Sequence, residues 1–162
     1  MDTKSAWFNK NTKRFIAGGL AIFVVFQVCD FIIHGPILGH YYKSLAGVWR
    51  QDMMSLMWIM YLSSFFFSYM MMWIFIKGFE DRGVMEGVRF GILIGILTNG
   101  MGSVYQYAVY PLPFSLVAQW FLYGLVEFIL AGIVAALIYK RQPEDETGEA
   151  EDDLEIVDEH VV

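Results

Sequence analysis

The sequence predicts an all-α fold: an integral membrane four-helix up-down-up-down bundle with an interfacial loop or short helix after the first span. The first observation behind this prediction is a set of four apolar stretches, each long enough for a helix to cross a bilayer core, which takes about 20 residues. These expected spans are residues 15–33, 53–76, 88–109 and 114–139. The second observation is that the connections between them are short, which makes consecutive helices antiparallel neighbours.

The third observation is the distribution of charge. The net charge is -6, but ten of the 17 acidic residues lie in the last 20 positions, so residues 1–142 carry 11 basic and seven acidic groups. Basic residues gather before the first span, between spans two and three, and after span four. By the positive-inside rule we expect a multi-pass membrane protein with both termini in the cytoplasm. The predicted segments are a basic N-terminus (1–14), a transmembrane domain (15–140) and a disordered acidic tail (141–162).

The first span is expected to be retained, because its apolar run is long and no small-x-small cleavage site follows it. The connection after it, residues 34–52, is too apolar for a plain aqueous loop. A Gly35-Pro36 pair favours a bend, and apolar residues at helical spacing then predict a short helix in the outer interface. These residues are Tyr41, Leu45 and Val48. Such a segment is either an interfacial anchor or a lid or partner-binding surface.

The remaining spans have distinct characters. Residues 53–76 are rich in aromatic rings and methionines, which favours a lipid-facing or partner-facing helix. Pro111 and Pro113 are expected to end the third span and to let the fourth begin afresh, because proline lacks a backbone donor and restricts the residue before it.

Small residues recur every four positions along the third span, and others lie on the fourth. They are Gly87, Gly91 and Gly95 in the third span and Gly124 and Gly132 in the fourth. Small residues let membrane helices approach closely, so spans three and four are expected to form a close pair. The same pattern could instead serve a homodimer.

Polar residues within the spans are the strongest functional signal, because an ionisable group at the centre of a membrane helix costs at least about 2.5 kcal/mol. Gln27, Asp30 and His34 share one helix face near the outer end of span one. Four more lie in spans three and four: Asn99, Gln106, Gln119 and Glu127. Antiparallel packing would bring them toward a polar pocket that opens outward.

Each of these groups also has a structural explanation. Asp30 and His34 could pair with each other, or with Arg50 or Lys43, to tie the first connection to the bundle. Alternatively they form a proton or ligand site. Glu127 has a structural role if it is protonated or hydrogen-bonded to Asn, Gln or Tyr on neighbouring helices. Alternatively, it serves transport.

No motif indicates a metal, a cofactor or an enzyme. The histidines and Cys29 lack the spacing of a dedicated metal site, and methionine commonly fills apolar helix faces. There is no nucleophile with an evident base and no phosphate-binding glycine loop. We therefore expect no catalytic residues, no cofactor and no nucleic-acid partner. The expected partners are the lipid bilayer and a second copy or another membrane protein.

Several short motifs resemble those of a group of small uncharacterised bacterial four-helix integral membrane proteins. The motifs are Asp30-Phe-Ile-Ile-His34-Gly35, Tyr41-Tyr42, Trp49-Arg50, Gly87-Val-Arg89-Phe-Gly91 and Pro111-x-Pro113 before a span with Trp120 and Gly124. The resemblance covers residues 15–140 and implies a four-helix fold in a bacterial inner membrane, with no activity attached. The leading functional hypothesis is an accessory or interaction protein. The alternative is an oligomeric small-solute or proton-coupled carrier that uses Asp30, His34 and Glu127.

Overall fold

The computed structural model describes residues 3–139, and side chains from Asn11 onward. The predicted acidic tail therefore lies outside the described residues. The elements are α1 (Thr3–Ile32), η1 (Ile33–Ile37), α2 (Gly39–Ser44), η2 (Met53–Leu56), α3 (Met57–Lys77), α4 (Val84–Gly95), η3 (Ile96–Gly100), α5 (Met101–Val109) and α6 (Phe114–Ile138). The described chain is all helical, as predicted, and four of its segments are long and apolar enough to cross a membrane. These segments are Asn11–Ile37, Met53–Lys77, Val84–Val109 and Phe114–Ile138.

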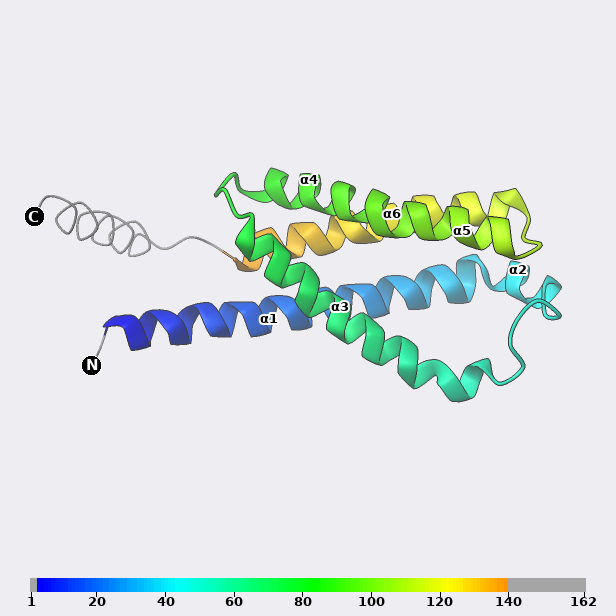
Figure 1. The fold of residues 1–162 in the computed structure, drawn as a ribbon, viewed down its shortest axis with the longest axis horizontal. Coiled ribbons are helices and arrows are strands. Elements are labelled where there is room, and N and C mark those ends of the chain that lie inside the picture. Colours follow the sequence, from blue (N-terminus) through cyan, green and yellow to red (C-terminus); the bar gives the residue numbers. More distant parts are fainter. Residues whose placement is uncertain (1–2, 140–162) are drawn as a thin grey trace, which may run out of the picture.

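The helices are arranged around α6. Figure 1 shows α1 running to the end of the molecule that carries α2, and α3 leading back from that end. The continuous segment α4–η3–α5 lies beside α6 along its length. α1 packs against both α3 and α6, so α6 lies between α1 on one side and α4–α5 on the other.

The first helix is longer than predicted. It begins at Thr3 rather than at residue 15, because residues 3–14 contain no glycine or proline to stop it. It also continues past Gly35 into the π-helical turn η1, which contains Pro36. Proline has no N–H to donate. The Leu38 N–H donates to the carbonyl of Ile33, five residues earlier, at 2.9 Å, which is the hydrogen bond of a π-helical turn. The predicted bend is thus a widened helical turn.

The proline turn forms where the sequence predicts it. α5 ends at Val109 and Tyr110 is extended, with a ψ of 146°. Pro113 then precedes the first residue of α6 with a φ of -66°. A fixed φ without a backbone donor suits a helix start, where the first N–H groups have no partner within the helix.

A glycine seam, Gly87 and Gly91 on α4 with Gly132 on α6, joins these two helices. A Cβ on Gly87 would meet the Gly132 carbonyl, and a Cβ on Gly91 would meet the carbonyl of Phe128. Backbone therefore touches backbone, which confirms the predicted close pair. The face is covered by α6 within one chain, so it is not the homodimer surface that the sequence also allowed.

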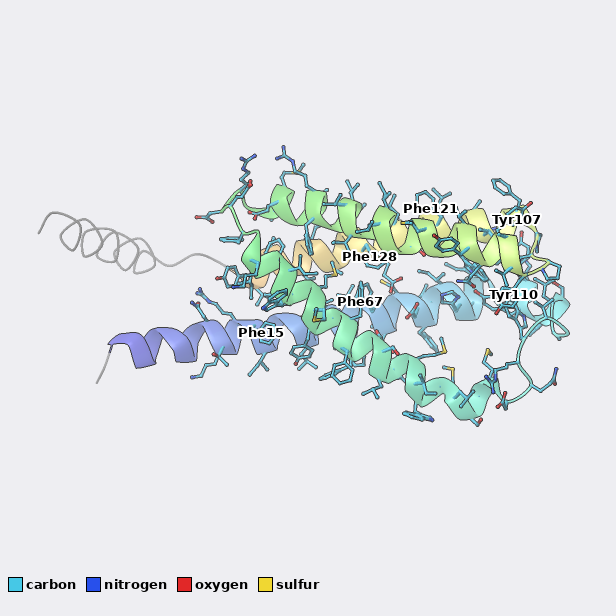
Figure 2. The ribbon with its side chains drawn as sticks, viewed as in Figure 1. Phe15, Phe67, Tyr107, Tyr110, Phe121 and Phe128 are labelled. Carbon is cyan, nitrogen blue, oxygen red and sulfur yellow. The ribbon has the colours of Figure 1, made fainter. Side chains whose placement is uncertain are left out.

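The prediction for α3 is wrong for half of the helix. Met71, Met72 and Phe75 are 1%, 0% and 2% exposed, in a core cluster with residues of α1 and α6. Figure 2 shows Phe67 of α3 close to Phe128 of α6, with ring centroids 5.7 Å apart. Residues 58–63 of the N-terminal half are exposed on every side, whereas the C-terminal half keeps Met70, Trp73 and Ile74 exposed on one face only. α3 begins away from the bundle and crosses it toward its C-terminal end (Figure 1).

The predicted short helix of the first connection is α2, which ends at Ser44, with turns after it. Leu38 begins this segment and is fully buried against Leu112 and Leu116 in a second cluster. Aromatic rings complete the cluster: Tyr41, Tyr42, Trp49, Trp120 and Tyr123. This aromatic cluster fixes the segment to the start of α6.

Candidate functional site

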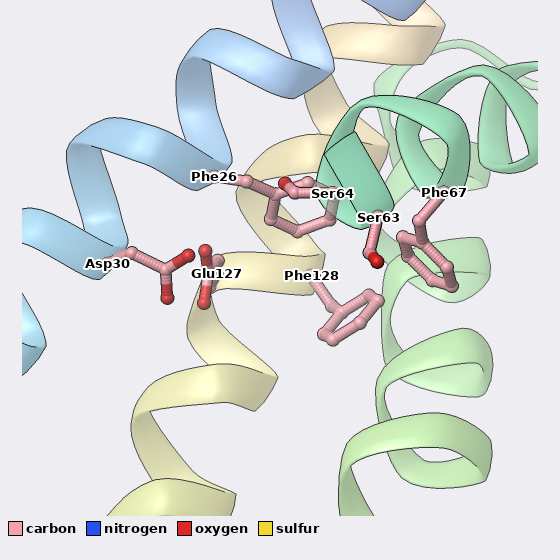
Figure 3. A pocket seen from close by; sticks show the side chains of 7 residues that line it. All are labelled: Phe26, Asp30, Ser63, Ser64, Phe67, Glu127 and Phe128. Atoms are coloured by element: carbon pink, nitrogen blue, oxygen red, sulfur yellow. The ribbon is translucent and has the colours of Figure 1, made fainter. Parts of the chain in front are cut away.

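A cavity lined by two carboxyl groups and three phenylalanine rings lies where α1, α3 and α6 meet. Its volume is about 390 Å³, and it opens to one side. The lining residues are Phe26 and Asp30 of α1, Ser63, Ser64 and Phe67 of α3, and Glu127 and Phe128 of α6 (Figure 3). It is called the carboxyl pocket below.

Three phenylalanine rings position the pocket. Phe26 lies 5.3 Å from Phe128 and 5.9 Å from Phe67, centroid to centroid, so one ring from each helix meets the other two. Asp30 follows Phe26 by four residues and therefore lies on the same face of α1, one turn further. Glu127 directly precedes Phe128 on α6. On the Asp30 side of the rings α3 diverges from the bundle (Figure 1).

Glu127 is the unusual member of the pocket. Its side chain points toward that of Asp30 (Figure 3). Only 8% of Glu127 is exposed, and its Oε1 atom is buried without a hydrogen-bond partner among the residues described. A buried polar atom left without a partner costs about 1–3 kcal/mol. Such an atom in a native fold indicates a functional role or a bound group.

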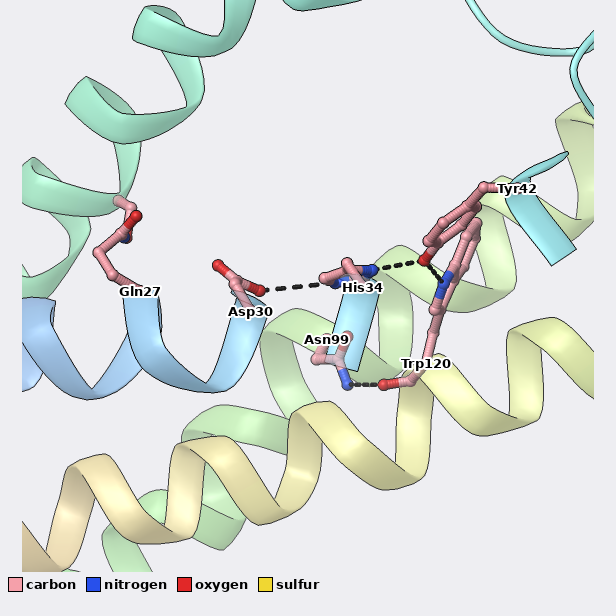
Figure 4. A network of polar contacts seen from close by, with 7 residues as sticks. Gln27, Asp30, His34, Tyr42, Asn99 and Trp120 are labelled. Atoms are coloured by element: carbon pink, nitrogen blue, oxygen red, sulfur yellow. Dashed lines mark hydrogen bonds and ion pairs between the residues drawn. The ribbon is translucent and has the colours of Figure 1, made fainter. Parts of the chain in front are cut away.

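A chain of polar contacts leads from the pocket to the aromatic cluster (Figure 4). The Nε2 atom of His34 lies 3.5 Å from Asp30 Oδ1, and its Nδ1 atom contacts the Tyr42 hydroxyl. Trp120 Nε1 donates to the same hydroxyl at 2.7 Å. Burial raises the pKa of Tyr42, the donation from Trp120 opposes this shift, and the charge of Asp30 adds to it. Asp30 is therefore linked to the packing of α2 on α6.

The structure selects one of the predicted partners of Asp30. Asp30 and His34 form the expected pair, whereas Arg50 bonds Asp52 instead, at 2.6 and 3.1 Å. The guanidinium group of Arg50 lowers the pKa of the Asp52 carboxyl below its usual value. A contact two residues away in sequence costs little chain entropy, which favours this local pair.

Of two more predicted residues, one lies beside the pocket and the other lies away from it. Gln27 Nε2 donates to the Ser64 hydroxyl at 3.0 Å and so ties α1 to α3 beside it. Gln119 Nε2 donates to the Tyr41 hydroxyl at 3.2 Å and to the Ser115 carbonyl at 3.0 Å. Gln119 therefore belongs to the aromatic cluster rather than to the carboxyl pocket.

The structure does not bring Asn99 or Gln106 to the pocket. Asn99 Nδ2 donates to the carbonyls of Trp120 and Phe121, at 3.1 Å each, and its amide packs on Gly124. Gln106 is exposed on α5. The reason is the order of the helices, since α6 separates α4–α5 from α1.

Sequence reasoning missed the serines and the phenylalanines of the pocket. Ser63 and Ser64 are adjacent hydroxyls within an apolar run, a signal that was present in the sequence. The phenylalanines gave none, because the chain has 14 of them. The role of Phe26, Phe67 and Phe128 depends on tertiary packing, which decides that these three rings meet.

Neither a search for metal ligands nor comparison with known proteins assigns a role to this site. In the part of the chain that the structure describes, no three His, Cys, Asp or Glu side chains come together to hold a metal ion. No protein-family model, no curated protein and no solved structure matches this chain.

Proposed function

We propose that this chain is a multi-pass protein of a bacterial inner membrane, with an up-down-up-down topology and both termini in the cytoplasm. Four long apolar helices support the membrane location. The excess of basic residues at one end of these helices supports the orientation. Under this orientation the aromatic cluster and α2 lie at the outer surface, where aromatic rings suit the interface.

The orientation predicts the outcome of a reporter experiment. A reporter fused after Val162 should be active only as a cytoplasmic reporter, and one inserted at Ser44 only as an external one. The physical reason is that basic segments resist translocation. Reporter activity with the opposite sign at both positions would reverse the orientation. Reporters that score on the same side would mean that an even number of spans, and not three, lies between them.

We infer further that the protein binds and carries a small solute at the carboxyl pocket, coupled to protonation of Glu127 and Asp30. The observation that carries this proposal is the Oε1 atom of Glu127, which is buried and lacks a partner within the described structure. A carboxyl group that served only to join helices would be expected to hydrogen-bond across them, as Asn99 does.

The proposed transport cycle uses the two carboxyl groups of the pocket and His34. Two facing carboxyl groups can hold one proton between them and can release it toward water when a positively charged solute binds in its place. His34 contacts Asp30 on the side toward α2 and offers a route for the proton to the outer surface. No covalent chemistry and no cofactor is involved. Four spans enclose little space, so we propose that the carrier is a homo-oligomer.

Carbodiimide labelling tests this function. Dicyclohexylcarbodiimide is apolar and reacts with protonated carboxyl groups in apolar surroundings. We expect one adduct on the detergent-solubilised full chain, located at Glu127 by mass spectrometry. Glu127→Gln should abolish the adduct, and Asp52→Asn, which changes an exposed carboxyl group outside the pocket, should not.

One outcome of the carbodiimide experiment would contradict the carrier proposal. If the folded wild-type protein stays unlabelled at Glu127 at every pH between 5 and 9, the carboxyl group is sealed or permanently ionised. The carrier proposal then fails.

A second candidate function, an accessory or interaction protein, has one supporting observation. The N-terminal half of α3 stands away from the bundle and exposes Trp58, Met60 and Phe66. A partner helix could pack there. Retention of full cellular function by Glu127→Gln, with loss of function by polar substitution of Trp58, would favour this candidate over the carrier.

A further inference from the structure

We propose that the solute of the carboxyl pocket is an organic monocation with an apolar body, such as a hydrophobic amine or quaternary ammonium compound. This inference rests on the proposed carrier function and specifies its substrate class. Three features of the pocket carry it: the sign of its charge, the nature of its walls and its size.

The charged groups that line the pocket are all acidic. Asp30 and Glu127 are its only ionisable side chains, and no Lys or Arg from the described residues joins them. His34 contacts Asp30 from outside the lining set. With one proton between them the two carboxyl groups carry a single negative charge, which complements a single positive charge. An anionic solute would be repelled.

The wall beside the carboxyl groups is apolar. Phe26, Phe67 and Phe128 make up three of the seven lining residues. Aromatic walls gain free energy from apolar contact and attract cations. The remaining polar atoms are the hydroxyls of Ser63 and Ser64, which can orient a solute without adding charge.

The size suits a small organic molecule. A cavity of about 390 Å³ lies within the range of roughly 300–1,000 Å³ typical of small-molecule sites. The cavity is open on one side rather than enclosed, and the Asp30 side chain that lines it is about half exposed.

An inorganic cation fits less well. Calcium takes six to eight oxygen ligands and magnesium demands a near-octahedral shell. The pocket offers two carboxyl groups and two hydroxyls, with rings in the remaining directions. An ammonium or phosphonium centre needs no such shell, because its charge is already spread over its substituents.

Two probes of the same shape and opposite charge test the inference. We would measure equilibrium binding of tetraphenylphosphonium and tetraphenylborate to the solubilised full chain, relative to protein-free micelles. The cation should bind saturably and the anion should not. Glu127→Gln and Asp30→Asn should each weaken cation binding by tenfold or more, while Asp52→Asn should leave it unchanged. The bound cation should also slow carbodiimide labelling of Glu127.

The outcomes separate the two proposals. If Glu127 is labelled by carbodiimide but the cation does not bind, or if both probes bind alike, the organic-monocation inference is wrong and the carrier proposal stands. Cation binding that both Glu127→Gln and Asp30→Asn leave intact places the site elsewhere and also overturns the inference. Protection of Glu127 by sodium chloride in place of the organic cation would indicate an inorganic substrate. Absence of both labelling and binding overturns both proposals.

Discussion

Replacing Gly132 or Gly91 with alanine is expected to destabilise the bundle by about 1–3 kcal/mol or more, the cost of overpacking a tight contact. The added methyl group would meet the backbone of the opposite helix, at the Gly87 carbonyl or at the Phe128 carbonyl. Backbone cannot rotate away as a flexible side chain can, so the two helices must separate along the seam. Thermal unfolding of the detergent-solubilised protein measures the loss.

The chain provides a matched control at Gly102. This glycine lies in α5, on the same membrane-length segment as Gly91, and a Cβ there would have nothing within 4 Å. Because alanine is a better helix former than glycine by about 0.5–1 kcal/mol, Gly102→Ala should be neutral or stabilising. Equal tolerance of alanine at positions 91, 102 and 132 would show that the α4–α6 contact is looser than described.

Glu127→Leu is expected to keep or raise the stability of the bundle while abolishing carbodiimide labelling and solute binding. Glu127 is buried, and its Oε1 atom has no hydrogen-bond partner in the described part of the chain. Leucine removes that unpaired atom, which costs about 1–3 kcal/mol in the wild type, and keeps a similar volume. A gain in thermal stability with a loss of activity is the signature of a residue retained for function.

Asn99→Leu is the matched control for this polar-to-apolar change. The Asn99 amide makes two hydrogen bonds to α6 carbonyls and packs on Gly124. Its replacement should lower stability, because both bonds are lost and the branched side chain crowds the helix. If Glu127→Leu instead destabilised the protein as much as Asn99→Leu, Glu127 would be structural glue, and the carrier proposal would lose its main support.

Local rules account for what the sequence predicted correctly. Apolar length predicts the four long helices, and the fixed geometry of proline predicts the turn between Val109 and Phe114. Four-residue glycine spacing predicts the α4–α6 contact, and four-residue spacing also predicts the pair of Asp30 with His34. The signal for each of these features, apolar length, a proline pair or four-residue spacing, lies within one helix or one turn.

By itself, then, the sequence determined the four long helices, the proline turn and the glycine faces of α4 and α6 that pack closely. Only the tertiary structure decided which polar side chains meet. Asn99 and Gln106 are excluded from the carboxyl pocket because α6 lies between their helix and α1. Glu127 faces Asp30 because three phenylalanine rings from three helices meet beside them. The physical reason is that helix periodicity sets the direction of a side chain relative to its own axis, whereas the order and crossing of helices depend on packing summed over the whole bundle.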